Sequence, residues 1–232
     1  MYKRKLFNSI SYISFMNYLS FDVGINNLAY CVLTPEKKIV GWGILNLNEN
    51  PVCCMNLRKP CEKQASYSVG KGDECKYYCT SHYKKVGSGR KLNSNRDLCN
   101  LSQICIKKLN TIDLSTIKHV LIENQPALKN PVMKSVQMII YTFFIMNGIM
   151  NINSPIENIH MVNARNKLKV YKGDPISCDK KGKYAQNKWL SVEYTKQMIG
   201  NEDEGHIQLF SLSKKKDDLA DAYLQGIYWI EK

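Results

Sequence analysis

Two acidic residues lie at the ends of apolar runs, where a carboxylate can do chemistry. Asp22 lies near the end of the β-rich run YLSFDV, and Glu123 closes the run KHVLIE. An acid beside an apolar strand is costly unless a cation or another partner compensates its charge. Carboxylate oxygens are ligands that Mg²⁺ prefers. Two such acids in one chain therefore predict a shared metal site.

A second pair of acids lies in the C-terminal segment KKKDDLADAYLQGIYWI. Asp218 and Asp221 are three positions apart and share a helix face, while Asp217 is an alternative to Asp218 because it lies four positions from Asp221. An acidic first turn that favours the helix dipole, or a solvated face, would also explain these acids. Combined with the strand-end acids, they predict phosphodiester hydrolysis by two metal ions about 3.5–4 Å apart.

The charge balance of the whole chain indicates a polyanionic partner. The 33 Lys and Arg residues exceed the 20 Asp and Glu residues and give a formal net charge of +13. Nucleic acid is the commonest partner of such a surface. A basic protein tuned only for solubility is the alternative.

Five of the nine cysteines gather in one segment that is poor in aliphatic residues and rich in lysine. A segment of this kind needs a metal to fold or remains disordered. Zinc takes four S or N ligands, which often arrive as two close pairs. We predict one structural Zn²⁺ in a reducing compartment, with Cys53 or Cys75 as alternative ligands and free thiols in a basic loop as the competing interpretation. The predicted ligands are Cys54, Cys61, Cys79 and His82.

Hydrophobic periodicity predicts strands and then alternating helices and strands, which is typical of an α/β fold with a mixed sheet covered by helices. The predicted strands are 18–23, 28–33, 39–47, 118–123 and 158–162, and the predicted helices are 95–109, 131–147, 189–199 and 217–230. A basic loop is expected from Arg165 to Lys188. The predicted organisation is an N-terminal extension, 1–17, followed by one domain, 18–232, that a zinc-binding insertion, 51–92, interrupts.

Two segments bear on partners and location. The helix 131–147 is apolar on more than one face, so it either pairs with a second copy in a homodimer or is buried within the monomer. No run reaches the roughly 18 continuous apolar residues of a membrane span, so no membrane partner is expected. Residues 1–17 are basic and free of acids, which fits either a mitochondrial transit peptide or a frayed extension of an intracellular protein.

Together, these motifs resemble the RuvC-like branch of the RNase H-like superfamily, and most closely the Holliday junction resolvases of poxviruses and other large DNA viruses. The segments FDVGINNLAYCVL, LIENQP and DDLADAYLQ resemble the first, second and last motifs of that family. The stretches NARNKL and KYAQNKWLSVEYT resemble its basic third region more loosely. The resemblance covers residues 18–50 and 95–230, and the Cys/His insertion favours relatives from other giant viruses over the compact poxvirus enzymes.

The resemblance implies a five-stranded RNase H-like mixed sheet and a magnesium-dependent endonuclease that resolves four-way DNA junctions by paired cuts. It implies two Mg²⁺ ions, with Mn²⁺ as an alternative, and a homodimer acting on branched DNA. Asp22 would bridge both ions, and Lys181, Lys183 and Lys188 would contact the scissile strand. The implied metal ligands are Asp22, Glu123, Asp218 and Asp221.

Other functions share some of these features. A transposon-associated nuclease with a zinc ribbon would carry two Cys-x-x-Cys pairs between the second and last acids, and this chain has neither that motif nor that placement. A ribonuclease acting on RNA–DNA hybrids shares the metal site. A zinc-dependent DNA-binding protein on a decayed nuclease fold would not need all four acids.

Overall fold

The computed structural model describes residues 16–47, 50–56, 58–92, 97–128 and 130–232. The predicted extension, 1–17, lies outside the described residues except for Met16 and Asn17, and Asn17 already belongs to the first strand. The predicted start of a helix at Asn95 also lies outside them.

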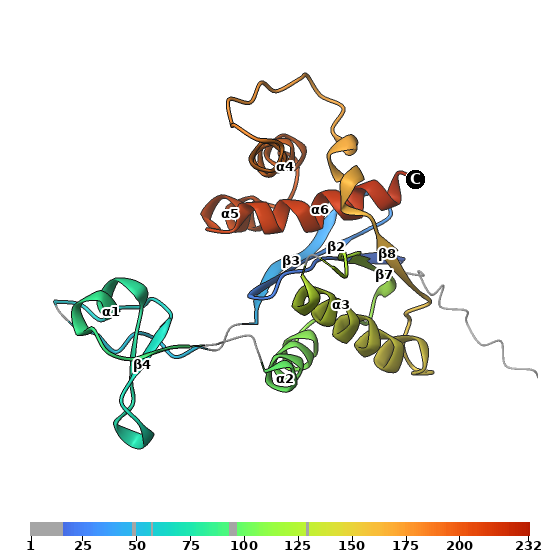
Figure 1. Cartoon of the computed structure of the whole chain (residues 1–232). Helices are drawn as coiled ribbons and strands as arrows, with labels where there is room; N and C mark the ends of the chain where they lie inside the picture. The colour runs from blue at the N-terminus through green and yellow to red at the C-terminus, as the bar shows by residue number, and fades with distance from the viewer. Residues whose placement is uncertain (1–15, 48–49, 57, 93–96, 129) are drawn as a thin grey trace, which may run out of the picture.

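A five-stranded mixed sheet forms the centre of the molecule, in the order β3-β2-β1-β7-β8 (Figure 1). The first three strands form an antiparallel meander, and β1-β7 and β7-β8 are parallel pairs. This architecture confirms the predicted fold class. The strands are β1 (Asn17–Asp22), β2 (Asn27–Leu33), β3 (Ile39–Asn46), β7 (Ile117–Glu123) and β8 (Asn158–Val162).

Helices cover both faces of this sheet, and each face has its own apolar core. On one face lie α2 (Leu98–Leu109) and α3 (Pro131–Phe144), which continues as a π-helical turn, Ile145–Ile149. Asn130 caps α3 by accepting the Met133 N–H at 3.2 Å, ahead of Pro131 at the first helical position. On the other face lie α4 (Lys183–Met198), α5 (Glu204–Leu212) and α6 (Lys216–Ile230).

The segment expected as a basic loop, Arg165 to Lys188, is partly helical, so that prediction is wrong. A 3₁₀ helix spans Ala164–Val170, and α4 begins at Lys183 rather than at Trp189. The first turns of α4 are polar and exposed, so they carry little hydrophobic periodicity for a sequence pattern to detect. The short helix α5 was not predicted.

The Cys-rich insertion folds as a small lobe, residues 51–92, that stands to one side of the sheet (Figure 1). Its sheet has the order β5-β4-β6, from β4 (Tyr67–Val69), β5 (Lys76–Tyr78) and β6 (Arg90–Lys91). A 3₁₀ turn, Gly72–Glu74, and helix α1 (Thr80–Val86) complete the lobe. Its buried apolar residues are few: Cys53, Tyr78 and Cys79 form the centre of its core.

Among the described residues, the helical stretch Pro131–Ile149 is long and apolar enough to cross a membrane by length and composition, and 33% of it is buried. In the structure, α3 packs on α2 and β7 and contributes Val136, Ile140 and Phe144 to the core. Part of the apolar surface of α3 is thus buried in the core of the domain.

Candidate active site and metal sites

The sheet brings Asp22 and Glu123 to the same edge. The parallel register pairs Phe21 of β1 with Ile122 of β7, so the next residue on each strand is the acid. The Val23 N–H donates to Glu123 Oε2 at 3.3 Å, which ties the two strand ends together. Because carboxyl ends of adjacent parallel strands meet at one sheet edge, the two acids lie side by side.

Glu123 is held by a buried amide. Gln125 Nε2 donates to Glu123 Oε2 at 2.6 Å, and the Gln125 N–H donates to Gln137 Oε1 on α3 at 2.8 Å. Both glutamines are buried, so these hydrogen bonds exchange little with water. The orientation of the Glu123 carboxylate is therefore set by α3 as well as by its own strand.

Helix α6 is anchored to the sheet by polar and steric contacts. Gln225 Nε2 donates to Ser20 Oγ and to the Phe21 carbonyl, both at 3.1 Å. Trp42 Nε1 donates to the Leu219 carbonyl at 3.1 Å. Gly226 permits the close approach, since a Cβ there would lie 2.5 Å from Leu33 Cδ1. These contacts hold the first turns of α6 beside the end of β1.

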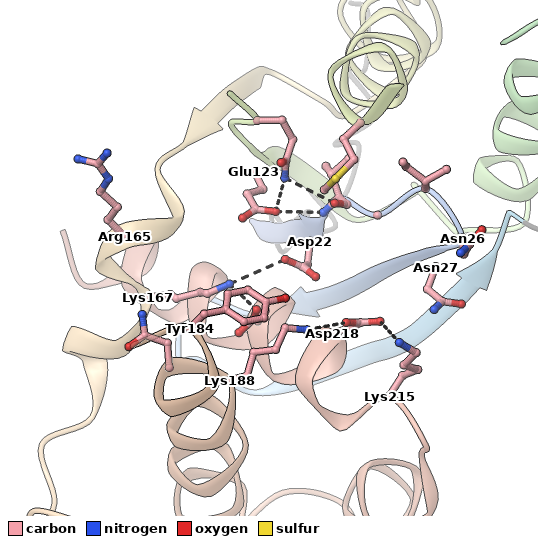
Figure 2. Close-up of a pocket in the computed structure, with 17 residues that line it drawn as sticks. Asp22, Asn26, Asn27, Glu123, Arg165, Lys167, Tyr184, Lys188, Lys215 and Asp218 are labelled. Carbon is pink, nitrogen blue, oxygen red and sulfur yellow. Dashed lines mark hydrogen bonds and ion pairs between the residues drawn. The ribbon is translucent and has the colours of Figure 1, made fainter. Parts of the chain in front are cut away.

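The acids of α6 consequently face the strand-end acids across a pocket of about 730 Å³. Asp22, Glu123, Asp218 and Asp221 all line it, whereas Asp217 does not. Figure 2 shows Asp22 between Glu123 on one side and Asp218 on the other.

Three lysines enter the same pocket and pair with these acids (Figure 2). Lys167, from the 3₁₀ helix, lies 2.5 Å from Asp221 Oδ2 and 3.9 Å from Asp22 Oδ1. Lys188 of α4 forms a short ion pair with Asp217 and lies 4.0 Å from Asp218 Oδ1. Lys215 Nζ lies 3.9 Å from Asp218 Oδ2. The lysines thus compensate carboxylates that burial would otherwise penalise.

Burial and the crowding of negative charge raise the pKa of two of the carboxylates in the pocket. Burial, together with repulsion from Glu123, raises the pKa of Asp22 well above its ordinary value. Burial, together with Asp217, also raises the pKa of Asp218. Burial alone would lower the pKa of Lys167, but attraction to Asp221 and Asp22 outweighs it, and the net shift is upward. The site therefore favours positive charge between its carboxylates.

The donor set fits a hard divalent cation. Asp221 Oδ1 is buried and has no hydrogen-bond partner within the described part of the chain, so one ligand oxygen is left over for a cation. The carboxylates supply oxygen ligands of the kind that Mg²⁺ takes. Within the same part of the chain they do not form a group as compact as the Cys/His cluster described below. Repulsion between like charges and the Lys167 ammonium between Asp22 and Asp221 are consistent with this wider spacing.

Only one of the three lysines predicted to contact nucleic acid lies in the pocket. Lys188 lines the pocket, whereas Lys181 and Lys183 are exposed and do not line it. Lys167 was not singled out from the sequence, although the motif that contains it, NARNKL, was. Its role depends on the fold of the 3₁₀ helix against α6, which no local pattern reveals. Other pocket residues that were missed are Asn26, Asn27, Gln125, Arg165, Tyr184, Asn187 and Lys215.

The lobe contains a second cluster of metal-ligand type, Cys53, Cys61, Cys79 and His82, whose ligand atoms all lie within 4.8 Å of one another. His82 Nδ1 lies 3.3 Å from Cys53 Sγ and 3.5 Å from Cys79 Sγ. Tetrahedral zinc with ordinary bond lengths places S and N ligands about 3.5 Å apart, so the spacing fits.

The prediction that Cys54 belongs to this cluster is wrong, because the structure places Cys53 there instead. Cys53 is buried beside the other three ligand residues, while Cys54 is exposed. Adjacent residues of an extended segment point to opposite sides, so only one of them faces the cluster. Cys75 also lies outside the cluster.

The chain is similar to one viral protein in sequence and to known resolvases in structure. No family model matches the chain. An uncharacterised protein of Acanthamoeba polyphaga mimivirus, L451, is 33% identical over 247 aligned positions, which cover 88% of this chain. The chain spans 59% of the length of that relative.

Its structural neighbours are Holliday junction resolvases. The yeast mitochondrial Holliday junction resolvase Ydc2 superposes with a TM-score of 0.54 at 15% identity, covering 93% of this chain and 79% of that one. The Fowlpox virus resolvase, solved with its substrate Holliday junction DNA, has a TM-score of 0.49 at 18% identity, with 93% and 97% coverage. The likeness to Ydc2 shows that this chain shares the fold of that resolvase.

Proposed function

We propose that this protein is a metal-dependent DNA endonuclease that resolves four-way junctions. The observation that carries the proposal is the convergence of four carboxylates from β1, β7 and α6 in one pocket that cations border. The shared fold with a Holliday junction resolvase supports the same substrate class. The net charge of +13 suits a DNA partner.

In this proposal, Asp22, Glu123, Asp218 and Asp221 hold two Mg²⁺ ions, for which Mn²⁺ can substitute. Bound metal would supply an activated water and stabilise the leaving oxygen of a phosphodiester. Gln125 keeps the Glu123 carboxylate oriented toward the pocket. Lys188 and Arg165, at the border of the pocket, attract the phosphates of the scissile strand. Lys181 and Lys183, which are exposed on and just before α4, meet the strand outside the pocket.

The Cys/His cluster is proposed to hold one structural Zn²⁺. The lobe has only a small apolar core, and a bound metal supplies folding free energy that such a core lacks.

The proposed assembly is a homodimer. Two symmetric cuts in a junction require two active sites, and a two-fold dimer matches the symmetry of that substrate. An apolar groove of about 570 Å³ between α2 and α3, with exposed Met138 and Met146, provides a surface for a second copy. Aromatic and Met residues are enriched in such interface cores.

The full-length protein, incubated with a synthetic four-way junction and Mg²⁺, tests this function. We expect paired nicks that EDTA abolishes. Asp22→Asn and Glu123→Gln should each lower the cleavage rate about a thousandfold or more, because lost ligands remove several kcal/mol of transition-state stabilisation. Junction binding should persist, since the lysines and arginines remain.

Glu36→Gln, an exposed substitution in the turn after β2, is the matched control and should cleave normally. Near-normal cleavage by Asp22→Asn would contradict the proposed site. A duplex and an RNA–DNA hybrid in parallel reactions separate junction resolution from a hybrid-specific ribonuclease. Binding of the junction with no cleavage in any metal would favour a DNA-binding protein on this fold.

A further inference from the structure

The lobe, residues 51–92, leaves the domain beside the catalytic pocket. Its N-terminal side follows β3, whose last residue, Asn46, pairs with Asn27 at the start of β2. The Leu47 N–H donates to the Asn26 carbonyl at 2.7 Å, and both Asn26 and Asn27 line the pocket. The lobe is therefore attached at the sheet edge that carries Asp22, next to two residues of the pocket wall, Asn26 and Asn27.

The surface of the lobe is strongly basic and uncompensated. Nine Lys and Arg residues face three Asp and Glu residues, a net charge of +6. All nine cations are exposed, and none makes an ion pair in the described part of the lobe. Exposed like charges repel one another, so a surface of this kind is best explained by a polyanionic partner. The nine are Arg58, Lys59, Lys63, Lys71, Lys76, Lys84, Lys85, Arg90 and Lys91.

Four of these cations flank the three-residue connection, 87–89, between α1 and β6. Lys84 and Lys85 lie in the last turn of α1, and Arg90 and Lys91 form β6. The Tyr83 hydroxyl donates to the Gly89 carbonyl at 3.2 Å and closes the connection between them. Gly89 lies so close to β4 that a Cβ there would be 2.3 Å from the Ser68 carbonyl oxygen.

The Cys/His cluster fixes the position of the helix that carries part of this basic surface. Its members are Cys53, Cys61, Cys79 and His82. Cys79 and His82 begin α1, and Cys53 joins them from the first residues of the lobe. Tyr67 of β4 stacks on Tyr83 of α1 at a centroid distance of 3.7 Å. The helix that carries Lys84 and Lys85 is thus held beside Cys53 and Cys61 by the cluster at its N-terminal end and against the small sheet by the aromatic pair.

We propose that the lobe is a second DNA contact, in which a metal-organised basic surface binds the phosphates of a duplex arm that leaves the catalytic pocket. The inference rests on the proposed function only in that the substrate is DNA. In this proposal the lobe binds the arm, and cleavage belongs to the four carboxylates of the pocket.

The test compares two lysine pairs that occupy equivalent helix positions. Lys84→Gln with Lys85→Gln removes the pair in the last turn of α1, and Lys107→Gln with Lys108→Gln removes the pair in the last turn of α2. Both changes remove the same charge and the same favourable interaction with a helix C-terminus. The α2 pair lies just before β7 begins at Ile117, at the end of that strand remote from Glu123. A third variant, Arg90→Gln with Lys91→Gln, probes β6.

All variants are made in the full-length Asp22→Asn protein, so that a labelled four-way junction is bound and not cut. Dissociation constants are measured between about 50 and 200 mM salt, a range over which an affinity that depends on phosphate contacts falls steeply. We expect each lobe variant to weaken binding about tenfold at the higher salt concentration. Loss of two phosphate contacts should reduce the slope of log affinity against log salt by about 1.8. The α2 variant should keep the affinity and slope of the parent.

Zinc content and thermal unfolding of each variant establish that the lobe remains folded. Equal affinity and equal salt slope in the lobe and α2 variants would overturn the inference. Failure of the parent protein to bind junction DNA at all would instead contradict the proposed function. The two failures are therefore distinguishable.

Discussion

At the scale of single residues, Lys167 has an unusual position because it lies between carboxylates that are proposed to hold metal. Its ammonium contacts Asp221 and approaches Asp22 while its side chain is only 16% exposed. A buried cation of this kind compensates the acids when no metal does so. The interaction therefore links the stability of the domain to the occupancy of the site.

Replacing Lys167 with Met should destabilise the protein in EDTA by about 3–5 kcal/mol, because it leaves buried carboxylates without a counter-charge. Mg²⁺ should reduce that difference, since a bound divalent ion restores the missing positive charge. Thermal unfolding with EDTA and with Mg²⁺ measures both effects. Lys169→Met, an exposed substitution on the same 3₁₀ helix, is the control. An unfolding temperature in EDTA equal to that of the control would contradict the assigned role.

At the scale of elements, the lobe consists of a three-stranded sheet of eight residues and one short helix. Its apolar core is too small to keep the lobe folded without further support. The main sheet, by contrast, has a large apolar core on each face. We therefore expect removal of a metal from the Cys/His cluster to unfold the lobe while the main domain stays folded.

Adjacent cysteines offer a sharp test of the zinc site. Cys53→Ser should reduce the zinc content from about one ion per chain to nearly none, because Cys53 is one of the four clustered ligands. Cys54→Ser should retain the ion, because Cys54 is exposed and lies outside the cluster. Metal analysis of freshly purified reduced protein distinguishes them. Zinc retention by the Cys53 variant, or zinc loss from the Cys54 variant, would contradict the ligand set.

At the scale of the whole molecule, α2 and α3 lie on one face of the sheet, while α4, α5 and α6 lie on the other (Figure 1). The apolar groove is lined by residues of α2 and α3 and of the turn after α3. A partner on the groove would leave the pocket of the four carboxylates accessible, because the two are lined by different residues. Two copies could therefore each present a pocket to one junction.

Light scattering at micromolar concentration should report about twice the 26.7 kDa chain mass. Met138→Glu with Met146→Glu should yield monomers, because both side chains line the groove and burying two carboxylates in an apolar interface is costly. Leu209→Glu with Leu212→Glu, a pair of exposed apolar residues on α5, is the control and should stay dimeric. A wild-type protein that remains monomeric on junction DNA would contradict the paired-cut assembly.

The sequence by itself determined the elements whose patterns are local. The alternation and length of the apolar runs predicted the five strands of the main sheet, and capping residues such as Asn130 predicted the start of α3. The strand-end positions of Asp22 and Glu123 were also readable, since an acid next to an apolar strand has few explanations other than a partner. Their catalytic roles remain predictions.

Only the tertiary structure decided which of several equivalent residues meet. Cys53 and Cys54 have nearly the same spacing to Cys61, and the direction of one side chain selects Cys53. Lys167 is one lysine among many in the sequence, and it is the packing of its 3₁₀ helix against α6 that brings it to Asp221. Asp217 and Asp218 are adjacent, yet α6 directs Asp218 into the pocket and leaves Asp217 to Lys188. These choices depend on contacts between segments far apart in the chain, and side-chain direction in space is not contained in any local pattern of residue types.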